Sequence, residues 1–78
     1  MITAEQIRGA RAMLRWSARK LAEMSGVSMP TIQRMESAVG VPKSISTNLD
    51  SIRRTLEDAG IAFIDDDEGP GVRLRKIR

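Results

Sequence analysis

Few side chains in this sequence are suited to catalysis. None of the 78 residues is Cys or His, which excludes disulfides, thiol nucleophiles, imidazole bases and the usual zinc ligand sets. Ser17 and Lys20 have the S-x-x-K spacing of penicillin-interacting serine enzymes, but the companion motifs are missing. The four carboxylates of residues 65–68 lack EF-hand spacing and indicate an exposed, solubilising loop. We therefore expect no enzyme, no metal and no cofactor, and we interpret Ser17 as a helix cap.

Basic side chains suggest a different chemistry. The net charge is only +3, but the first 45 residues carry seven Lys or Arg against three Glu, and Arg73, Arg75, Lys76 and Arg78 follow near the end. Such clustering favours a nucleic-acid partner. Arg34 is the sharpest candidate, because a guanidinium can donate two hydrogen bonds to the O6 and N7 of a guanine, worth about 1–3 kcal/mol of discrimination.

Helices must position these residues. Thr3 and Gln6 form a capping-box pattern with Ile2 and Ile7 as its hydrophobic staple, so a first helix should start at Ala4. Ser17 and Ser28 are candidate N-caps of two short helices. The apolar spacing predicts helices over about 4–14, 18–25, 29–37 and 47–58.

The second and third of these helices form the central unit of the prediction. Two short helices with a glycine in the turn between them allow one helix to brace on a DNA backbone while the other enters the major groove. Ala22 supplies the small residue for close helix crossing, and Gly26 supplies the sharp turn. The apolar wedge between the helices is expected to contain Leu21, Val27, Ile32 and Met35.

The pattern changes period after Gly60. Alternating residues predict strands at Ile61–Ile64 and Val72–Arg75, with an open polar loop over Asp65–Gly71 rather than a tight turn. An isolated two-stranded hairpin is marginal in water. We therefore hypothesise that the strands pair across subunits, with apolar area buried between them by Ile61, Phe63, Val72 and Leu74.

The stretch WSARKLAEMSGVSMPTIQRMES resembles the Cro/repressor-like (XRE) helix-turn-helix family, and EDAGIAFIDDDEGPGVRLRK is similar to the ending of its short members. The resemblance implies a mainly α, four-helix domain with a C-terminal β-hairpin or strand pair. It also implies that Trp16 packs against the first helix. Many members have Gln directly after the cap of the second helix to bind a phosphate, whereas this chain has Ala18.

The resemblance and the side-chain chemistry together assign the contacts. The base-reading residues are expected to be Met29, Thr31, Gln33 and Arg34, and the phosphate ligands are expected to be Arg15, Ser17, Arg19, Lys20 and Ser28. Arg8, Arg11 and Arg15 form a row on the first helix, and we interpret the row as a solvated face. Arg15, nearest the second helix, is the strongest candidate among them for a functional contact.

One domain is expected, with residues 1–60 for DNA binding, the helix-turn-helix unit at 18–37, and 61–78 for dimerisation. One recognition helix contacts few base pairs, so we expect a homodimeric regulator of transcription on a pseudo-palindromic operator with half-sites roughly 34 Å apart. The resemblance implies that such a regulator controls its own promoter. The alternatives are a protein-interaction module, such as an antiactivator or antitoxin, and an architectural DNA protein. No signal peptide or membrane span is evident, so a cytoplasmic location is the default.

Overall fold

The computed structural model describes residues 1–76 and shows four helices followed by a two-stranded antiparallel sheet. The predicted C-terminal element extends to residue 78, so its last two positions lie outside the described residues. The elements are α1 (Ala4–Leu14), α2 (Ala18–Ser25), α3 (Met29–Glu36), α4 (Ser46–Asp58), β1 (Ile61–Asp66) and β2 (Gly69–Leu74). No helix in the described part of the chain is long and apolar enough to cross a membrane.

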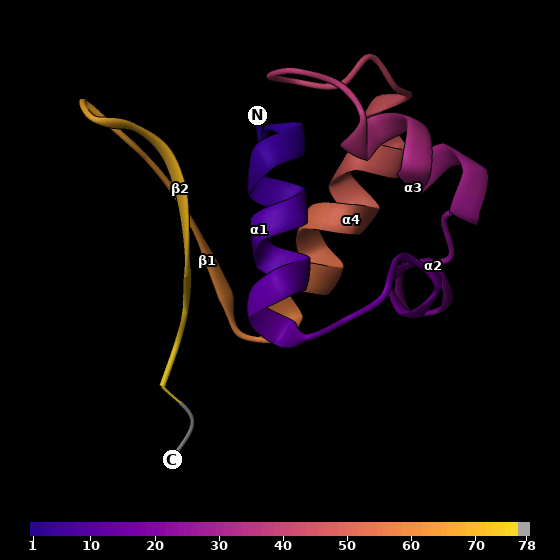
Figure 1. Cartoon of the computed structure of the whole chain (residues 1–78), viewed down its shortest axis with the longest axis horizontal. Coiled ribbons are helices and arrows are strands. Elements are labelled where there is room, and N and C mark those ends of the chain that lie inside the picture. The colour runs from indigo at the N-terminus through magenta and orange to yellow at the C-terminus, as the bar shows by residue number, and fades with distance from the viewer. Residues whose placement is uncertain (77–78) are drawn as a thin grey trace.

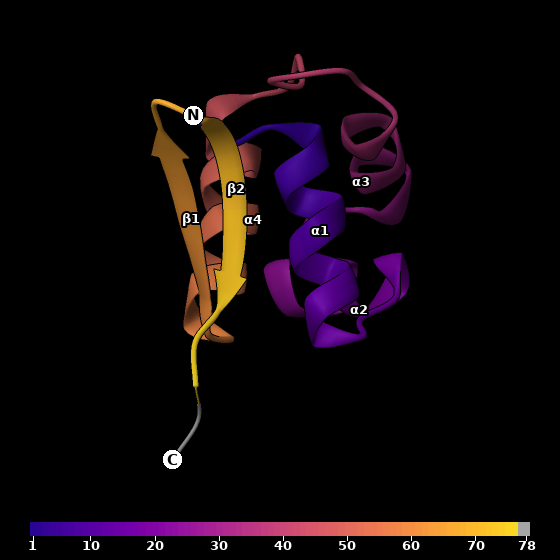
Figure 2. The ribbon, with the colours of Figure 1, turned by 60° about the vertical axis from the view of Figure 1, so that its left-hand side comes forward.

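The elements stack in three layers (Figure 1). The sheet covers one side of the α1 and α4 layer, and α2 and α3 lie on the opposite side. Figure 2 shows the hairpin in front of α4, with α1 beside β2. Residues from all of the helices and from β1 meet in one core, whose fully buried large side chains are Ile7, Leu21, Ile32, Ile52, Leu56 and Ile61. The four helices and the two strands therefore share a single hydrophobic core.

The local signals of the first helix act as predicted. The Thr3 hydroxyl accepts a hydrogen bond from the Gln6 backbone N–H, and the Gln6 side chain accepts one from the Thr3 N–H, which completes the capping box. Ile2 and Ile7 are both buried in the core. Ser17 caps α2 by accepting from the Lys20 N–H at 3.0 Å. Three of the helix starts are as expected, and α4 begins one residue earlier than predicted, at Ser46.

The prediction of an open loop over Asp65–Gly71 is wrong. The strands continue to Asp66 and Gly69, and a two-residue turn joins them. The Asp66 carboxylate accepts the Glu68 backbone N–H at 3.0 Å, and Gly69 has a φ of 114°, which favours glycine. Gly-Pro-Gly thus belongs to a strand, although its residue types usually interrupt one.

Gln6 joins the beginning of the chain to the hairpin. Its amide is buried, and the amide nitrogen donates to the carbonyl oxygens of Ile64 at 3.0 Å and Gly71 at 2.9 Å, which belong to paired residues on the two strands. Close packing beside it depends on Gly9, where an added Cβ would approach Val72 to 3.2 Å. One side chain therefore contributes both to the N-cap of α1 and to the seating of the sheet.

Replacing Gln6 with Met should lower the free energy of unfolding by about 1–2 kcal/mol. The thioether keeps the length of the side chain but loses the hydrogen bonds to the cap and to both strands. Urea unfolding followed by circular dichroism measures the change. Gln33→Met is the matched control, because Gln33 is exposed on α3 and should change stability by less than about 0.5 kcal/mol. Equal effects of the two variants would contradict this role of Gln6.

Candidate nucleic-acid interface

Helices α2 and α3 are joined by a three-residue turn, Gly26–Ser28. Gly26 has a φ of 75°, and an added Cβ there would meet no atom within 4 Å, so the backbone conformation rather than space requires glycine. The four wedge residues Leu21, Val27, Ile32 and Met35 are all buried. Figure 1 shows α2 nearly end-on and α3 from the side, so the axes of the two helices cross steeply.

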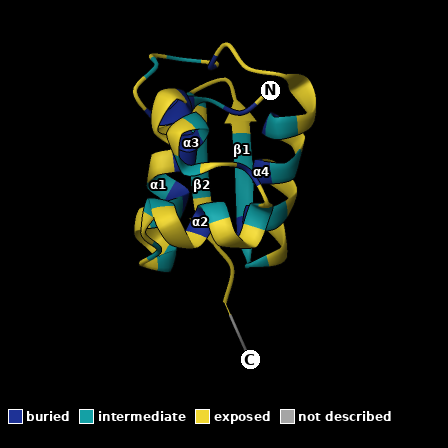
Figure 3. Cartoon of the chain, turned by 90° about the vertical axis from the view of Figure 1, so that its right-hand side faces the viewer, coloured by how far each residue is buried: buried dark blue, intermediate teal, exposed yellow. Residues whose placement is uncertain are grey.

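The outer surface of α2 and α3 faces away from the sheet, and much of it is exposed (Figure 3). Gln33 and Arg34 are exposed on α3, whereas Met29 and Thr31 are half-buried. The Thr31 hydroxyl lies 2.8 Å from the Ser28 hydroxyl. A guanidinium nitrogen of Arg34 lies 3.5 Å from the same Thr31 hydroxyl. Ser28, Thr31 and Arg34 therefore line one face of α3 at three-residue spacing.

Ser28 differs in detail from its prediction as a cap. It occupies the N-cap position of α3, but its hydroxyl pairs with Thr31 instead of accepting a backbone N–H. Pro30 in the first turn has no N–H, and within residues 1–76 no acceptor bonds the N–H of Met29 or Thr31. The exposed start of α3 thus combines hydroxyl donors with backbone donors at the positive end of a helix dipole, a combination suited to a phosphate.

The five residues expected to bind phosphate lie at or near the α1–α2 and α2–α3 junctions. Ser17, Arg19 and Lys20 are exposed at the start of α2, Arg15 is exposed in the link before it, and Ser28 is exposed at the start of α3. The ion pairs found among the described residues join Arg8 to Glu5, Arg11 to Glu36 and Arg53 to Glu57. Arg15, Arg19, Lys20 and Arg34 have no such partner in that part of the chain, so their charges face solvent.

The interpretation of Arg11 as part of a solvated row is wrong. Its guanidinium donates to both Glu36 carboxylate oxygens, at 2.8 and 2.7 Å, and to the Trp16 carbonyl at 2.9 Å. Only 24% of the Arg11 side chain and 10% of the Glu36 side chain are exposed. The hydrogen bonds to Glu36 raise the pKa of Arg11 above its ordinary value, so the guanidinium stays charged. Arg8 also donates to the Glu36 carbonyl.

This pair holds the candidate interface in place, and sequence reasoning missed it. Arg11 connects α1, the residue before the cap of α2, and the last turn of α3. A carboxylate in the last turn of a helix is unfavourable against the helix dipole unless a cation compensates for it. Glu36 at the end of the predicted third helix was therefore the signal that a buried arginine should be sought.

Glu36→Gln should lower the free energy of unfolding by about 3 kcal/mol, because it leaves a largely buried guanidinium without its counter-charge. Glu57→Gln is the matched control: its pair with Arg53 is exposed on α4, and its loss should cost less than about 1 kcal/mol. Urea titrations of both variants measure the difference. A similar small loss in the two proteins would show that the Glu36 pair contributes no more than a surface contact.

Arg15 has a left-handed backbone, with a φ of 57°. It closes α1, and the Trp16 N–H donates back to the Arg11 carbonyl at 2.9 Å. Glycine is the usual residue in this conformation, which costs other residues about 1 kcal/mol. The arginine is therefore placed here at a cost in stability, as is common where a side chain serves another purpose.

Arg15→Gly should consequently raise the free energy of unfolding by about 1 kcal/mol while weakening any binding to DNA. Ala12→Gly, on an exposed and right-handed part of α1, should lower it by roughly the same amount. Thermal unfolding measures stability, and the salt slope of binding measures phosphate contacts, with about one unit lost per contact. A variant that is more stable and binds DNA unchanged would remove Arg15 from the interface.

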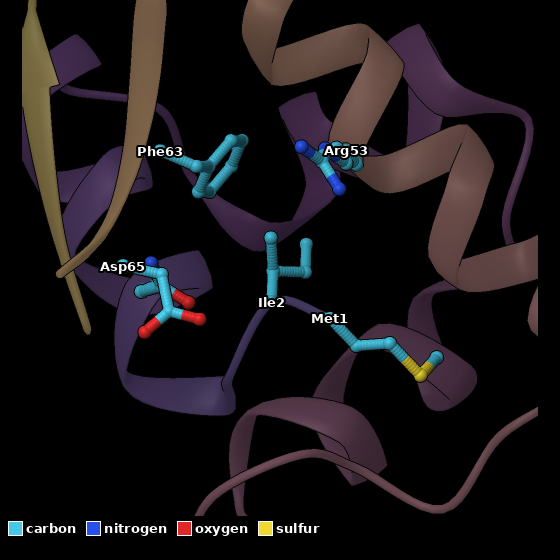
Figure 4. Close-up of a pocket in the computed structure, with 6 residues that line it drawn as sticks. Met1, Ile2, Arg53, Phe63 and Asp65 are labelled. Carbon is cyan, nitrogen blue, oxygen red and sulfur yellow. The ribbon is translucent and has the colours of Figure 1, made fainter. Parts of the chain in front are cut away.

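A concave site on another part of the molecule is small. A cleft of about 110 Å³ is lined by Met1, Ile2, Gln6, Arg53, Phe63 and Asp65 (Figure 4). It is well below the size of most ligand sites, and Arg53 is already paired with Glu57 at 3.3 Å. Among residues 1–76 no three His, Cys, Asp or Glu side chains gather where they could hold a metal ion.

The four residues assigned to the subunit contact have different surroundings. The strands pair within one chain. Ile61 is fully buried in that chain, and Phe63 and Val72 are half-buried against its core. Leu74 is 38% exposed. Ile61 thus belongs to the core of its own subunit and has no apolar surface left to offer a partner, although dimerisation itself stays a prediction.

Comparison with known proteins adds no relative to this picture. A scan against protein-family models finds no match to the chain, and a search of curated proteins finds none either. The case for function therefore rests on the geometry of α2 and α3 and on the charges around them.

Proposed function

We propose that this protein is a sequence-specific, double-stranded DNA-binding regulator of transcription that uses α2 and α3 as a Cro/repressor-like helix-turn-helix. In this proposal α3 enters the major groove, and the start of α2 rests on the phosphate backbone. The observation that carries the proposal is the exposed polar face of α3, with Ser28, Thr31 and Arg34 in line and without an ion-pair partner for Arg34 in the described chain.

The division of labour among the arginines supports this proposal. Arg8, Arg11 and Arg53 are engaged in ion pairs within the described chain. By contrast, Arg15 lies just before the two-helix unit and Arg34 lies on its second helix, and both are exposed to solvent. A guanidinium that has no ion-pair partner among the described residues and lies on the exposed face of a short helix is available for bidentate recognition of guanine.

Individual residues of α3 suit different contacts. Arg34 and Gln33 have the hydrogen-bonding heads that read base edges, and Met29 suits a thymine methyl group or a sugar. Ser28 and the first N–H groups of α3 suit a phosphate, as do Ser17, Arg19 and Lys20 on α2. Because one such unit reads only a few base pairs, we further propose a homodimer on a pseudo-palindromic operator.

Arg34→Ala should weaken binding to the specific site by about 5- to 150-fold, the equivalent of the 1–3 kcal/mol expected for a bidentate contact to guanine. Binding to unrelated DNA should fall much less. Arg53→Ala removes the same charge beside the hairpin and should leave both affinities within about twofold. Fluorescence anisotropy with DNA from the protein's own promoter, compared with scrambled DNA at two salt concentrations, measures these affinities.

The salt dependence decides between the functional classes. Phosphate contacts predict that binding weakens steeply as salt rises. A flat salt response, together with equal affinities for Arg34→Ala and the unaltered protein, would exclude this proposal and favour a protein-interaction module. Strong bending of DNA with little sequence preference would favour an architectural role.

A further inference from the structure

The edge of β2 that does not face β1 has backbone groups available for pairing with another strand. The register pairs Ile61 with Leu74 and Asp66 with Gly69, and the Arg75 N–H donates to the Gly60 carbonyl at 2.8 Å. Antiparallel pairs alternate between hydrogen-bonded and non-bonded. The backbone groups of Val72 and Leu74 therefore point away from β1. Pro70 also falls on this outer side, where its missing N–H costs the hairpin nothing.

We propose that β2 pairs antiparallel with β2 of a second copy, with Val72 on the two-fold axis, so that two hairpins form one four-stranded sheet. In this register Leu74 lies opposite the partner's Pro70, and its N–H donates to that carbonyl. The two Val72 residues exchange a pair of backbone hydrogen bonds. The missing N–H of Pro70 removes one possible bond on each side and leaves the others intact.

Charge favours this edge over the other. Around Val72, Lys76 of one copy lies opposite Glu68 of the other, so the basic end of each hairpin meets the acidic turn of its partner. In contrast, the charged side chains of β1 (Ile61–Asp66) are all acidic, so the same operation on β1, centred on Phe63, forms no pair of opposite charge. Shifting the axis to Arg73 would place two arginines opposite each other. Cross-strand pairs of opposite charge stabilise a sheet, and like charges destabilise it.

Gly71 supplies an independent reason to expect that β2 pairs with a second copy. Its φ does not lie in the left-handed region, and an added Cβ would meet Ile64 only at an ordinary 3.9 Å. Nothing in the chain's own fold therefore requires glycine at this position. In the proposed dimer Gly71 lies opposite the partner's Arg73, in a non-bonded pair where side chains approach most closely. A glycine there leaves room for the long arginine side chain.

The arrangement also suits one DNA duplex. Edge-to-edge pairing has its two-fold axis perpendicular to the sheet, and α3 lies on the side of the helical layer remote from the sheet (Figures 1 and 3). Both copies of α3 would then face the same direction. Stacking the two sheets face to face would instead turn the α3 helices away from each other. This step alone rests on the proposed function; the arguments from the edge, the charges and Gly71 do not.

Amide hydrogen exchange of the full chain without DNA tests the edge directly. The N–H groups of Val72 and Leu74 should become at least tenfold more protected as protein concentration is raised across the dimerisation range. The N–H groups of Phe63 and Asp65 point away from β2 at the other edge of the hairpin. They serve as internal controls, and their exchange should not depend on protein concentration. A dimer detected by light scattering in which Val72 and Leu74 stay unprotected would overturn the proposal. That result would indicate an interface elsewhere, for example at the loop containing Val39 and Ile45, which are 92% and 67% exposed.

Charge reversal tests the register. Lys76→Glu and Glu68→Lys should each weaken the dimer roughly tenfold at low salt, because each change acts twice across the two-fold axis. The double variant should return to within about threefold of the original. Asp58→Lys is the control for a similar charge change on α4 and should have little effect. Single variants that dimerise normally, or a double variant that is not restored, would exclude this register.

The two proposals fail separately. If specific DNA binding is found but β2 does not pair with a second copy, the proposed interface is rejected and the proposed regulator function is kept. If β2 pairs as proposed but binding to DNA does not depend on salt, the regulator function is rejected and the interface is kept.

Discussion

The pairing of Arg11 with Glu36 is the interaction on which the arrangement of α1, α2 and α3 depends. Only a planar guanidinium can bind both carboxylate oxygens and still donate to the Trp16 carbonyl, so a lysine would not replace it. These contacts tie the residue before the cap of α2 and the last turn of α3 to α1. The hydrophobic wedge holds the two helices together, and the ion pair fixes their position on α1. The exposed face of α3 is thereby carried on a rigid support.

On the other side of the molecule, a single side chain again connects several elements. The amide of Gln6 uses its oxygen for the start of α1 and its nitrogen for two strand carbonyls. The sheet therefore rests on hydrogen bonds as well as on apolar contact, in a protein with only two aromatic residues. Polar groups buried with all their partners add specificity to a small core, because alternative packings would leave them unsatisfied.

Much of this fold follows from signals within a few residues of one another. The capping box, the serine at residue 17 and the glycine at residue 26 place the helices correctly, since each acts through its own backbone. What sequence reasoning missed depends on residues far apart in the chain. The partner of Arg11 lies 25 residues away, and those of Gln6 lie 58 and 65 residues away. The tight turn was missed because the turn chemistry of Asp66 and Gly69 outweighs the usual strand-breaking tendency of Gly-Pro-Gly. On the candidate interface, sequence identifies suitable side chains on α3, whereas ion pairing decides which arginines remain available.

The contact between Gln6 and the hairpin has a consequence for synthesis of the protein. Its members stand near opposite ends of the described chain, so the contact forms late and closes a long loop. α1 is synthesised more than 50 residues before β2, whereas α4 precedes β2 by only about ten, so the face of α1 waits longest for the sheet. The fold of these residues is therefore completed only when β2 docks on α1, and a chain stalled before Gly71 keeps that face of α1 exposed to chaperones.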